Sequence, residues 1–144
     1  MFGNKKKKHN AELLAPIWLA DMKKARDVVN STTDPDAFFT DYESLKDLAA
    51  KLVELSKYVK FRGTKPAEVL KMAQEQEEAA TRDFILRSFQ RALLGAEKAK
   101  TAKGKRSQFD RFLEKLEPYY CQMSAGNAEL VQQLHADAIE RIGG

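Results

Sequence analysis

The sequence predicts an all-α protein, an antiparallel bundle of about five helices. Apolar residues recur every three to four positions through most of the chain, which is the spacing of one face of a helix. No stretch of useful length alternates apolar and polar residues as a half-buried strand does. The breaks between the periodic segments are short, so consecutive helices are expected to pack against each other in opposite directions.

The chain begins with a basic segment that differs from the rest. Residues 1–10 are predicted to be a disordered tail, because the adjacent lysines Lys5–Lys8 repel one another and bury nothing. Residues 11–144 are predicted to form a single helical domain. A chain of 144 residues can bury about 68% of the surface that its unfolded form exposes, so it can build a core without disulfides.

The strongest helix signal runs from Pro35 to about Lys60, and a first helix is expected before it, from Ala11 or Pro16 to Val29. Asp34 can accept hydrogen bonds from the free N–H groups of the next turn, and proline at the first helical position loses no bond. Gly63 is expected to end this helix as a left-handed cap. The predicted core-facing stripe of the helix comprises Phe38, Tyr42, Leu45, Ala49, Leu52, Ser56 and Val59. This long helix is expected to be the central one of the bundle.

Three or four shorter helices are expected after Gly63. Periodic segments begin at Pro66 and at Thr81, and two more end near Pro118 and Ile142. The polar run Gln74–Glu78 is consistent with a break, a kink or a solvated bridge. Gly104 is expected to interrupt the chain between helices.

Several of these segments resemble a known group of proteins. The turn Asn30–Pro35 with Phe38-Phe39, Asp83-Phe84-Ile85 with Arg87, and the stretch Lys100–Lys105 are similar to an uncharacterised family of small helical domains from Firmicutes and related gut bacteria. The resemblance covers roughly Asp27 to Ile142. It implies an all-helical fold and a bacterial source, and it transfers no activity and no catalytic residue.

The residues for most site chemistries are missing. A phosphate loop needs clustered glycines, and a usual zinc site needs four Cys or His ligands, whereas the chain has one Cys and two His. Two groups of carboxylates, Glu75/Glu77/Glu78 and Asp110/Glu114/Glu117, are interpreted as solvated faces rather than as a cation site or a catalytic pair. The sequence therefore predicts no enzyme, no catalytic residue, no cofactor and no metal site.

Two features of the sequence bear on the cellular location. Cys121 is the only cysteine, which suits a reducing compartment. The uncharged stretch Leu13–Ala20 is far shorter than the roughly 20 residues that cross a membrane. We therefore expect a cytoplasmic protein.

The net charge of +4 is distributed unevenly. Lys5–Lys8 form one basic run, and a second run without an acidic residue extends from Lys98 to Arg106; the rest of the chain is net acidic. The candidate anion-binding residues in the second run are Lys98, Lys100, Lys103, Lys105 and Arg106.

Two functions remain consistent with the sequence. The first is a protein–protein interaction or scaffold module without catalysis, binding another protein or a second copy of itself. The second is weak, non-specific binding of nucleic acid or an anionic membrane through the two basic runs. Simple solvation also explains both runs, and no small-molecule substrate is inferred.

Overall fold

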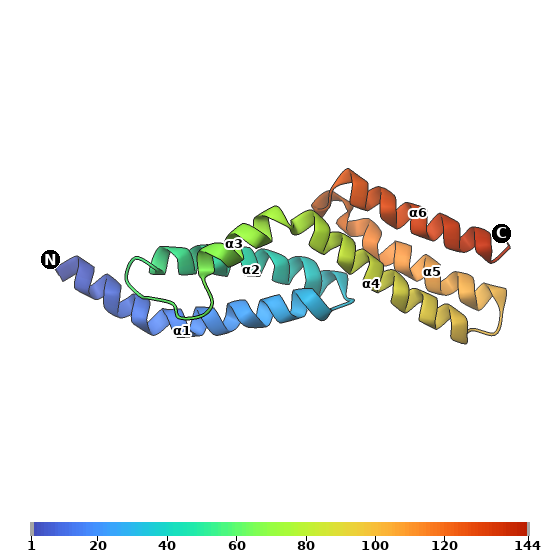
Figure 1. Ribbon diagram of the computed structural model, residues 1–144. Coiled ribbons are helices and arrows are strands. Elements are labelled where there is room, and N and C mark those ends of the chain that lie inside the picture. Colours follow the sequence, from blue (N-terminus) through green and yellow to red (C-terminus); the bar gives the residue numbers. More distant parts are fainter. Residues whose placement is uncertain (1, 144) are drawn as a thin grey trace. The chain divides into compact units, whose positions relative to one another are not determined.

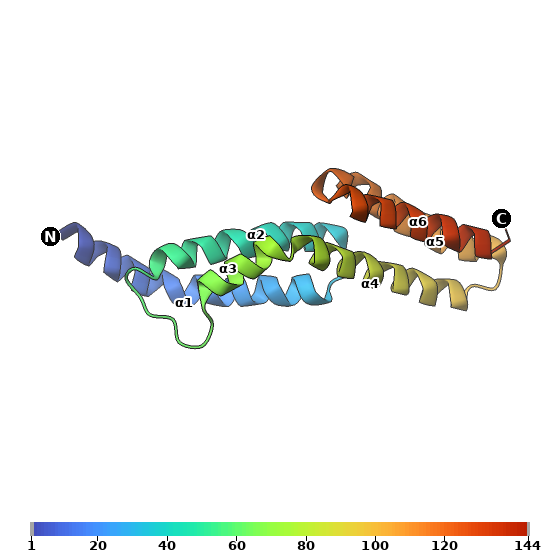
Figure 2. The same cartoon turned by 45° about the horizontal axis from the view of Figure 1, so that its top comes forward.

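The computed structural model describes residues 2–143, which form six α-helices and one 3-10 helix, with no strand in that range. The elements are α1 Phe2–Ser31, α2 Pro35–Leu55, α3 Pro66–Glu75, α4 Glu77–Lys98, α5 Ala102–Leu116, η1 Glu117–Gln122 and α6 Ala125–Arg141. Consecutive helices run in opposite directions in the pair α1–α2 and in the series α4–α5–α6 (Figures 1 and 2). The predicted all-α bundle is confirmed, with six α-helices rather than about five. None of the helices in residues 2–143 combines the length and the apolarity that a membrane crossing requires.

The chain divides into two compact units. The first unit contains α1, α2 from Ala37 onward and α3, and it ends at Glu77. The second unit contains the linker Thr32–Asp36 and the chain from Glu78 onward, with α4, α5, η1 and α6. The sequence predicts one domain over residues 11–144, and the division into two units was not part of that prediction.

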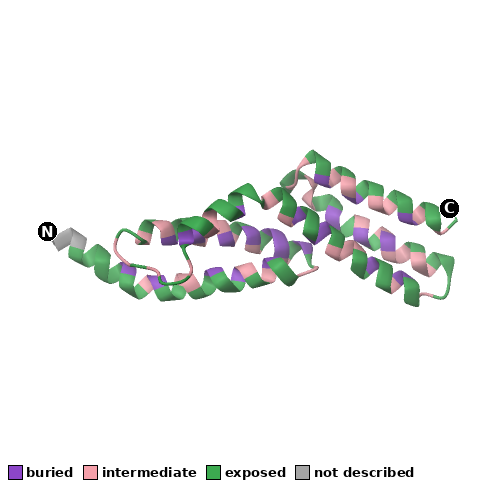
Figure 3. Ribbon diagram, in the orientation of Figure 1, coloured by how far each residue is buried: buried purple, intermediate pink, exposed green. Residues whose placement is uncertain are grey.

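The core of the first unit lies between α1 and α2. Buried residues follow the sides of α1 and α2 that face each other (Figure 3). On α1 many of them are small, including Ala11, Ala15 and Ala25, so the larger side chains of α2 can approach closely. The rings of Phe38 and Phe39 pack edge to face, 5.1 Å between centroids.

The beginning of α1 differs from the expected tail. The described residues Phe2–Asn10 are helical, and the side chains of residues 5–10 are all exposed. Lysine is a good helix former, so the run Lys5–Lys8 favours continuation of the helix through this segment. Pro16 lies within α1 at an exposed position.

The helix α2 begins at Pro35 as predicted, but it ends at Leu55 rather than near Lys60. The backbone N–H of Asp36 donates to Asp34 Oδ1 at 3.3 Å, which is the expected cap. At the other end, the Ser56 hydroxyl donates to the Val53 carbonyl, and such side-chain bonds compete with the helical pattern. Gly63, with φ of +88°, lies in the following loop and is not the helix cap.

Two further breaks were expected from the sequence, one within Gln74–Glu78 and one at Gly104. The run Gln74–Glu78 contains a break at Gln76, the residue between α3 and α4, where φ is −107°. Gly104 is not a break, because it lies in the first turn of α5, where its N–H donates to Oγ1 of the cap residue Thr101. Ser124 caps α6 in the same way.

The core of the second unit is formed by α4, α5 and α6. The ring of Phe89 lies 5.7 Å from that of Phe109 and 5.4 Å from that of Phe112, which joins α4 to α5. Asn127 of α6 is buried, and its amide donates to the Glu78 carbonyl at 3.1 Å. Arg87 donates to the Thr32 carbonyl, which fixes the linker Thr32–Asp36 against α4.

Candidate functional site

The candidate site is an apolar groove of about 550 Å³ in the second unit, between α4, α5 and α6. Its apolar lining comprises Phe89, Leu93, Ala96, Ala102, Phe109, Leu134, Ala138 and Ile142. Four charged residues complete the lining, namely Glu97, Lys105, Asp137 and Arg141. An apolar hollow edged by charges of both signs is typical of a surface that binds another apolar group.

Small residues leave room for the groove. Ala96, Ala102 and Ala138 lie where larger side chains would fill the space between the three helices. Leu93 consequently remains 37% exposed, although its helical spacing is that of a core residue. Phe89, Leu93 and Leu134 all have the helical spacing of core residues, and periodicity does not distinguish a buried position from one at the edge of a groove.

The second basic run extends from the end of α4 into α5. Lys105 Nζ donates to the Ala96 carbonyl at 3.0 Å, so its charge lies at the negative C-terminal end of α4. Arg106 Nε lies 3.8 Å from Asp110 Oδ2. Lys98, Lys100 and Lys103 are exposed. Of the five predicted anion-binding residues, Lys103 and Arg106 line one small hollow, whereas Lys105 lines the apolar groove. Lys105 and Arg106 also contact groups of the same chain.

The first basic run, Lys5–Lys8, lies on the exposed start of α1. Successive residues of an α-helix are rotated by about 100°, so four adjacent lysines point to different sides of it. This run does not form a single basic face.

The two groups of carboxylates are divided among different contacts. Glu77 pairs with Lys46 in the first unit, whereas Glu78 accepts a hydrogen bond from Ser124 in the second. His135 is half-buried, and its Nε2 lies 2.8 Å from Asp110 Oδ1, so the carboxylate of Asp110 is paired with this histidine. No group of three potential metal ligands occurs among residues whose side chains the structure describes.

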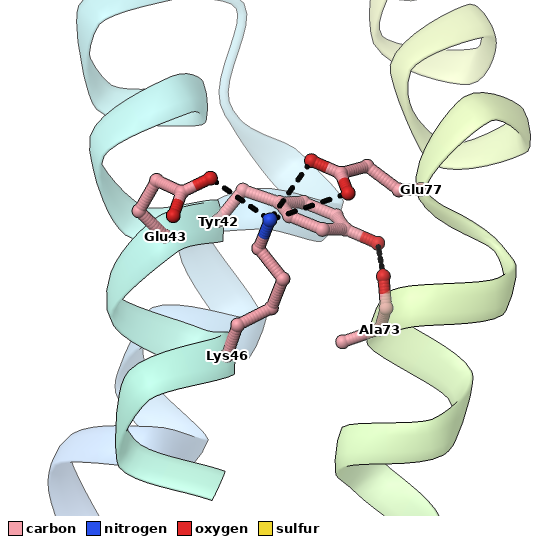
Figure 4. Close-up of polar contacts among 5 residues, drawn as sticks. All are labelled: Tyr42, Glu43, Lys46, Ala73 and Glu77. Carbon is pink, nitrogen blue, oxygen red and sulfur yellow. Dashed lines mark hydrogen bonds and ion pairs between the residues drawn. The ribbon is translucent and has the colours of Figure 1, made fainter. Parts of the chain in front are cut away.

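A polar cluster lies in the first unit between α2, the end of α3 and Glu77, the first residue of α4 (Figure 4). Lys46 Nζ contacts Glu43 at 2.8 Å and both oxygens of Glu77 at 3.1 and 3.2 Å. The Tyr42 hydroxyl donates to the Ala73 carbonyl at 2.6 Å. Burial raises the pKa of Tyr42 to about 12, with a smaller contribution in the same direction from Glu77 and an opposing one from Lys46. Every polar group in this cluster has a partner within it, which indicates a structural junction.

Comparison of the chain with protein-family models, curated proteins and solved structures found no match. The resemblance to helical domains of Firmicutes therefore stays a prediction from the residues. The candidate site rests on its geometry alone.

Proposed function

We propose that the protein is a scaffold module without catalysis, in which the apolar groove of one copy binds α1 of a second copy. The observation that carries this proposal is the groove itself, an apolar surface between α4, α5 and α6 that these helices leave uncovered. Recognition of an amphipathic helix by an apolar groove is a common mode of protein–protein binding.

The proposed occupant is a ridge on α1 formed by Leu13 and Ile17. Each side chain is 58% exposed, and the two lie one turn apart on the same helix face. The buried residues of α1, such as Ala11 and Ala15, lie at other positions around the helix and pack within the first unit. The chain thus contains both an exposed apolar ridge and an apolar groove, and each would lose contact with water if they met.

The lining of the groove holds two carboxylates, Glu97 and Asp137, and two cations, Lys105 and Arg141, so its formal charges cancel. The proposed contact therefore depends on the burial of apolar surface rather than on attraction between opposite charges. Burying the exposed parts of two aliphatic side chains contributes on the order of 2 kcal/mol, so self-association is expected to be weak and to depend on concentration.

The ridge and the groove are different surfaces, so their contact is heterologous. Such a contact leaves one free ridge and one free groove in every pair, which allows further copies to add. In this proposal the protein is a cytoplasmic, bacterial scaffold that grows by this contact. The bacterial source follows from the resemblance, and the free Cys121 suits a reducing compartment.

Two variants and their mixture test the proposal. Leu13→Lys with Ile17→Lys removes the ridge, and Leu93→Lys places a charge in the groove. In analytical ultracentrifugation, the unmodified protein is expected to show mass increasing with concentration, and each variant alone is expected to be monomeric. An equal mixture of the two variants retains one intact ridge and one intact groove, so it is expected to form dimers and nothing larger.

The matched control is Leu94→Lys, the next residue of α4, which is 52% exposed and does not line the groove. It is expected to associate like the unmodified protein, and circular dichroism checks that all variants remain helical. A monomeric unmodified protein at high concentration would overturn the proposal, as would equal loss of association in Leu94→Lys.

The alternative is weak, non-specific binding of nucleic acid or an anionic membrane through Lys5–Lys8 and Lys98–Arg106. Its support is the exposure of Lys98, Lys100 and Lys103. It has less support than the groove because Lys105 and Arg106 have partners within the chain. Fluorescent DNA and anionic vesicles, titrated at low and at physiological salt, test it. Absence of binding at low salt excludes it, because charge attraction is strongest there.

A further inference from the structure

A second hollow, the basic pocket, lies in the second unit between the linker Thr32–Asp36, α4 and α5. Its volume is about 240 Å³. Three cationic side chains line it: Arg91 from α4, and Arg111 and Lys115 from α5. Its lining includes no carboxylate. This pocket is distinct from the apolar groove, and it does not include the predicted basic runs.

The three cations of the pocket lack ion-pair partners in the part of the chain whose side chains the structure describes. Arg111 and Lys115 are one helical turn apart, and like charges at this spacing repel. The nearby carboxylate of Asp110 contacts His135 and Arg106 instead. Binding of an anion would relieve this repulsion.

Neutral polar groups complete the polar side of the pocket. Arg91 Nη1 donates to Thr33 Oγ1, which joins α4 to the linker. Ser88 Oγ is buried and has no hydrogen-bond partner among the described residues. A buried hydroxyl without a partner is uncommon in folded proteins, and here it belongs to a residue that lines the pocket. Gln108 adds an amide.

The remaining lining is apolar and buried, and it is provided by Pro35, Ala92, Phe112 and Leu116. The pocket thus combines a cationic side with a hydrocarbon side. We propose that it binds a small phosphate monoester, with the phosphate at Arg91, Arg111 and Lys115 and the organic group against Phe112 and Leu116. Two guanidinium groups match the oxygens of a phosphate in pairs, and three cations suit its double negative charge. The small volume favours a ligand of few atoms.

Calorimetric and NMR titrations with three probes test this assignment. Phenyl phosphate carries both parts of the proposed ligand, inorganic phosphate carries only the anion, and phenol carries only the ring. Phenyl phosphate is expected to bind most tightly, with amide shifts concentrated at Ser88, Arg91 and Arg111. Arg111→Gln is expected to weaken its binding at least about tenfold, because a lost charge-assisted hydrogen bond has about that effect.

Two further variants separate a built site from general charge attraction. Lys98→Gln removes one positive charge from an exposed position outside the pocket, and it is expected to leave binding unchanged. Ser88→Ala keeps a good helix former and removes only the hydroxyl, so it is expected to stay folded and to bind phenyl phosphate a few-fold more weakly. The proposal is overturned if phenyl phosphate fails to saturate the protein. It is also overturned if phenol binds equally well, or if Lys98→Gln weakens binding as much as Arg111→Gln does.

Discussion

The hydroxyl of Tyr42 donates a 2.6 Å hydrogen bond to the backbone carbonyl of Ala73. Ala73 lies in the last turn of α3, which ends at Glu75, and carbonyls of a last turn have no partner within their own helix. A side chain of α2 therefore satisfies the end of α3. This bond joins two helices of the first unit that the loop 56–65 separates in sequence.

Tyr42→Phe is expected to lower the free energy of unfolding by about 1–2 kcal/mol, because the buried Ala73 carbonyl loses its partner. Urea denaturation followed by circular dichroism measures the change. Tyr58→Phe, in the half-exposed turn after α2, is the matched control and is expected to change stability by less than about 0.5 kcal/mol. Equal effects of the two substitutions would contradict the assigned role of this bond.

The same residue is expected to make stability depend on pH in the alkaline range. Burial raises the pKa of Tyr42 from 10.0 to about 12 in the folded protein. The folded state then holds the phenolic proton where the unfolded state has released it. This contribution is complete below pH 10 and is lost as the pH rises toward 12.

The comparison of unfolding curves between unmodified protein and Tyr42→Phe isolates this contribution from other titrating groups. Their difference in stability is expected to shrink as the pH increases through this range. A difference that stays constant would show that the Tyr42 pKa is the same in both states.

The ion pairs of Lys46 and Lys57 are expected to contribute differently to the free energy of unfolding. Lys46 is 21% exposed and contacts Glu77, whereas Lys57 is 67% exposed and contacts only Glu54. We expect Lys46→Gln to destabilise by about 0.5–1 kcal/mol and Lys57→Gln to have no measurable effect. Thermal unfolding at low and high salt measures both. A larger loss for Lys57→Gln would contradict the assignment.

Gly95 lies in the interior of α4, where glycine is unfavourable by about 1 kcal/mol relative to alanine. A Cβ at this position would lie 2.5 Å from Gln108 Oε1 and 2.8 Å from its Cδ. We expect Gly95→Ala to be close to neutral, because the gain in helix propensity is offset by displacement of the Gln108 side chain.

The double-mutant cycle tests this explanation. In a Gln108→Ala background the obstacle is absent, so Gly95→Ala is expected to stabilise by about 1 kcal/mol. Chemical denaturation of the four proteins gives the coupling between the two positions. Equal effects of Gly95→Ala in both backgrounds would show that the Gln108 side chain does not offset the gain in helix propensity at position 95.

Local signals account for the helix features that were predicted well. The start of α2 at Pro35 depends on Asp34 and on proline geometry, which are both contained in adjacent residues. The end of α2 was predicted five residues too late, because the stripe continues through Val59 while Ser56 bonds to a backbone carbonyl. The prediction that Gly104 separates two helices is wrong, because Thr101 caps α5 and Gly104 lies in the first turn of that helix.

The candidate sites were not predictable in the same way. Arg91 and Arg111 are widely separated in sequence, and each is an ordinary charged residue on a helix; only the packing of α4 on α5 brings them to one pocket. Leu93 and Leu134 have the spacing of core residues, and only the small residues opposite them leave a groove. The predicted run Lys98–Arg106 is continuous in sequence, but in the structure Lys105 contacts the Ala96 carbonyl and Arg106 lies near Asp110, and only Lys103 and Arg106 line the same small hollow.

The sequence by itself determined that this protein is all-helical and roughly where its helices lie, because helical periodicity, caps and breaks act between residues a few positions apart. The tertiary structure alone decided the division into two units, the groove between α4, α5 and α6, and the pocket of Arg91, Arg111 and Lys115. These features depend on which faces meet and how large the side chains between them are. Such contacts join residues far apart in the chain, and no local pattern records them.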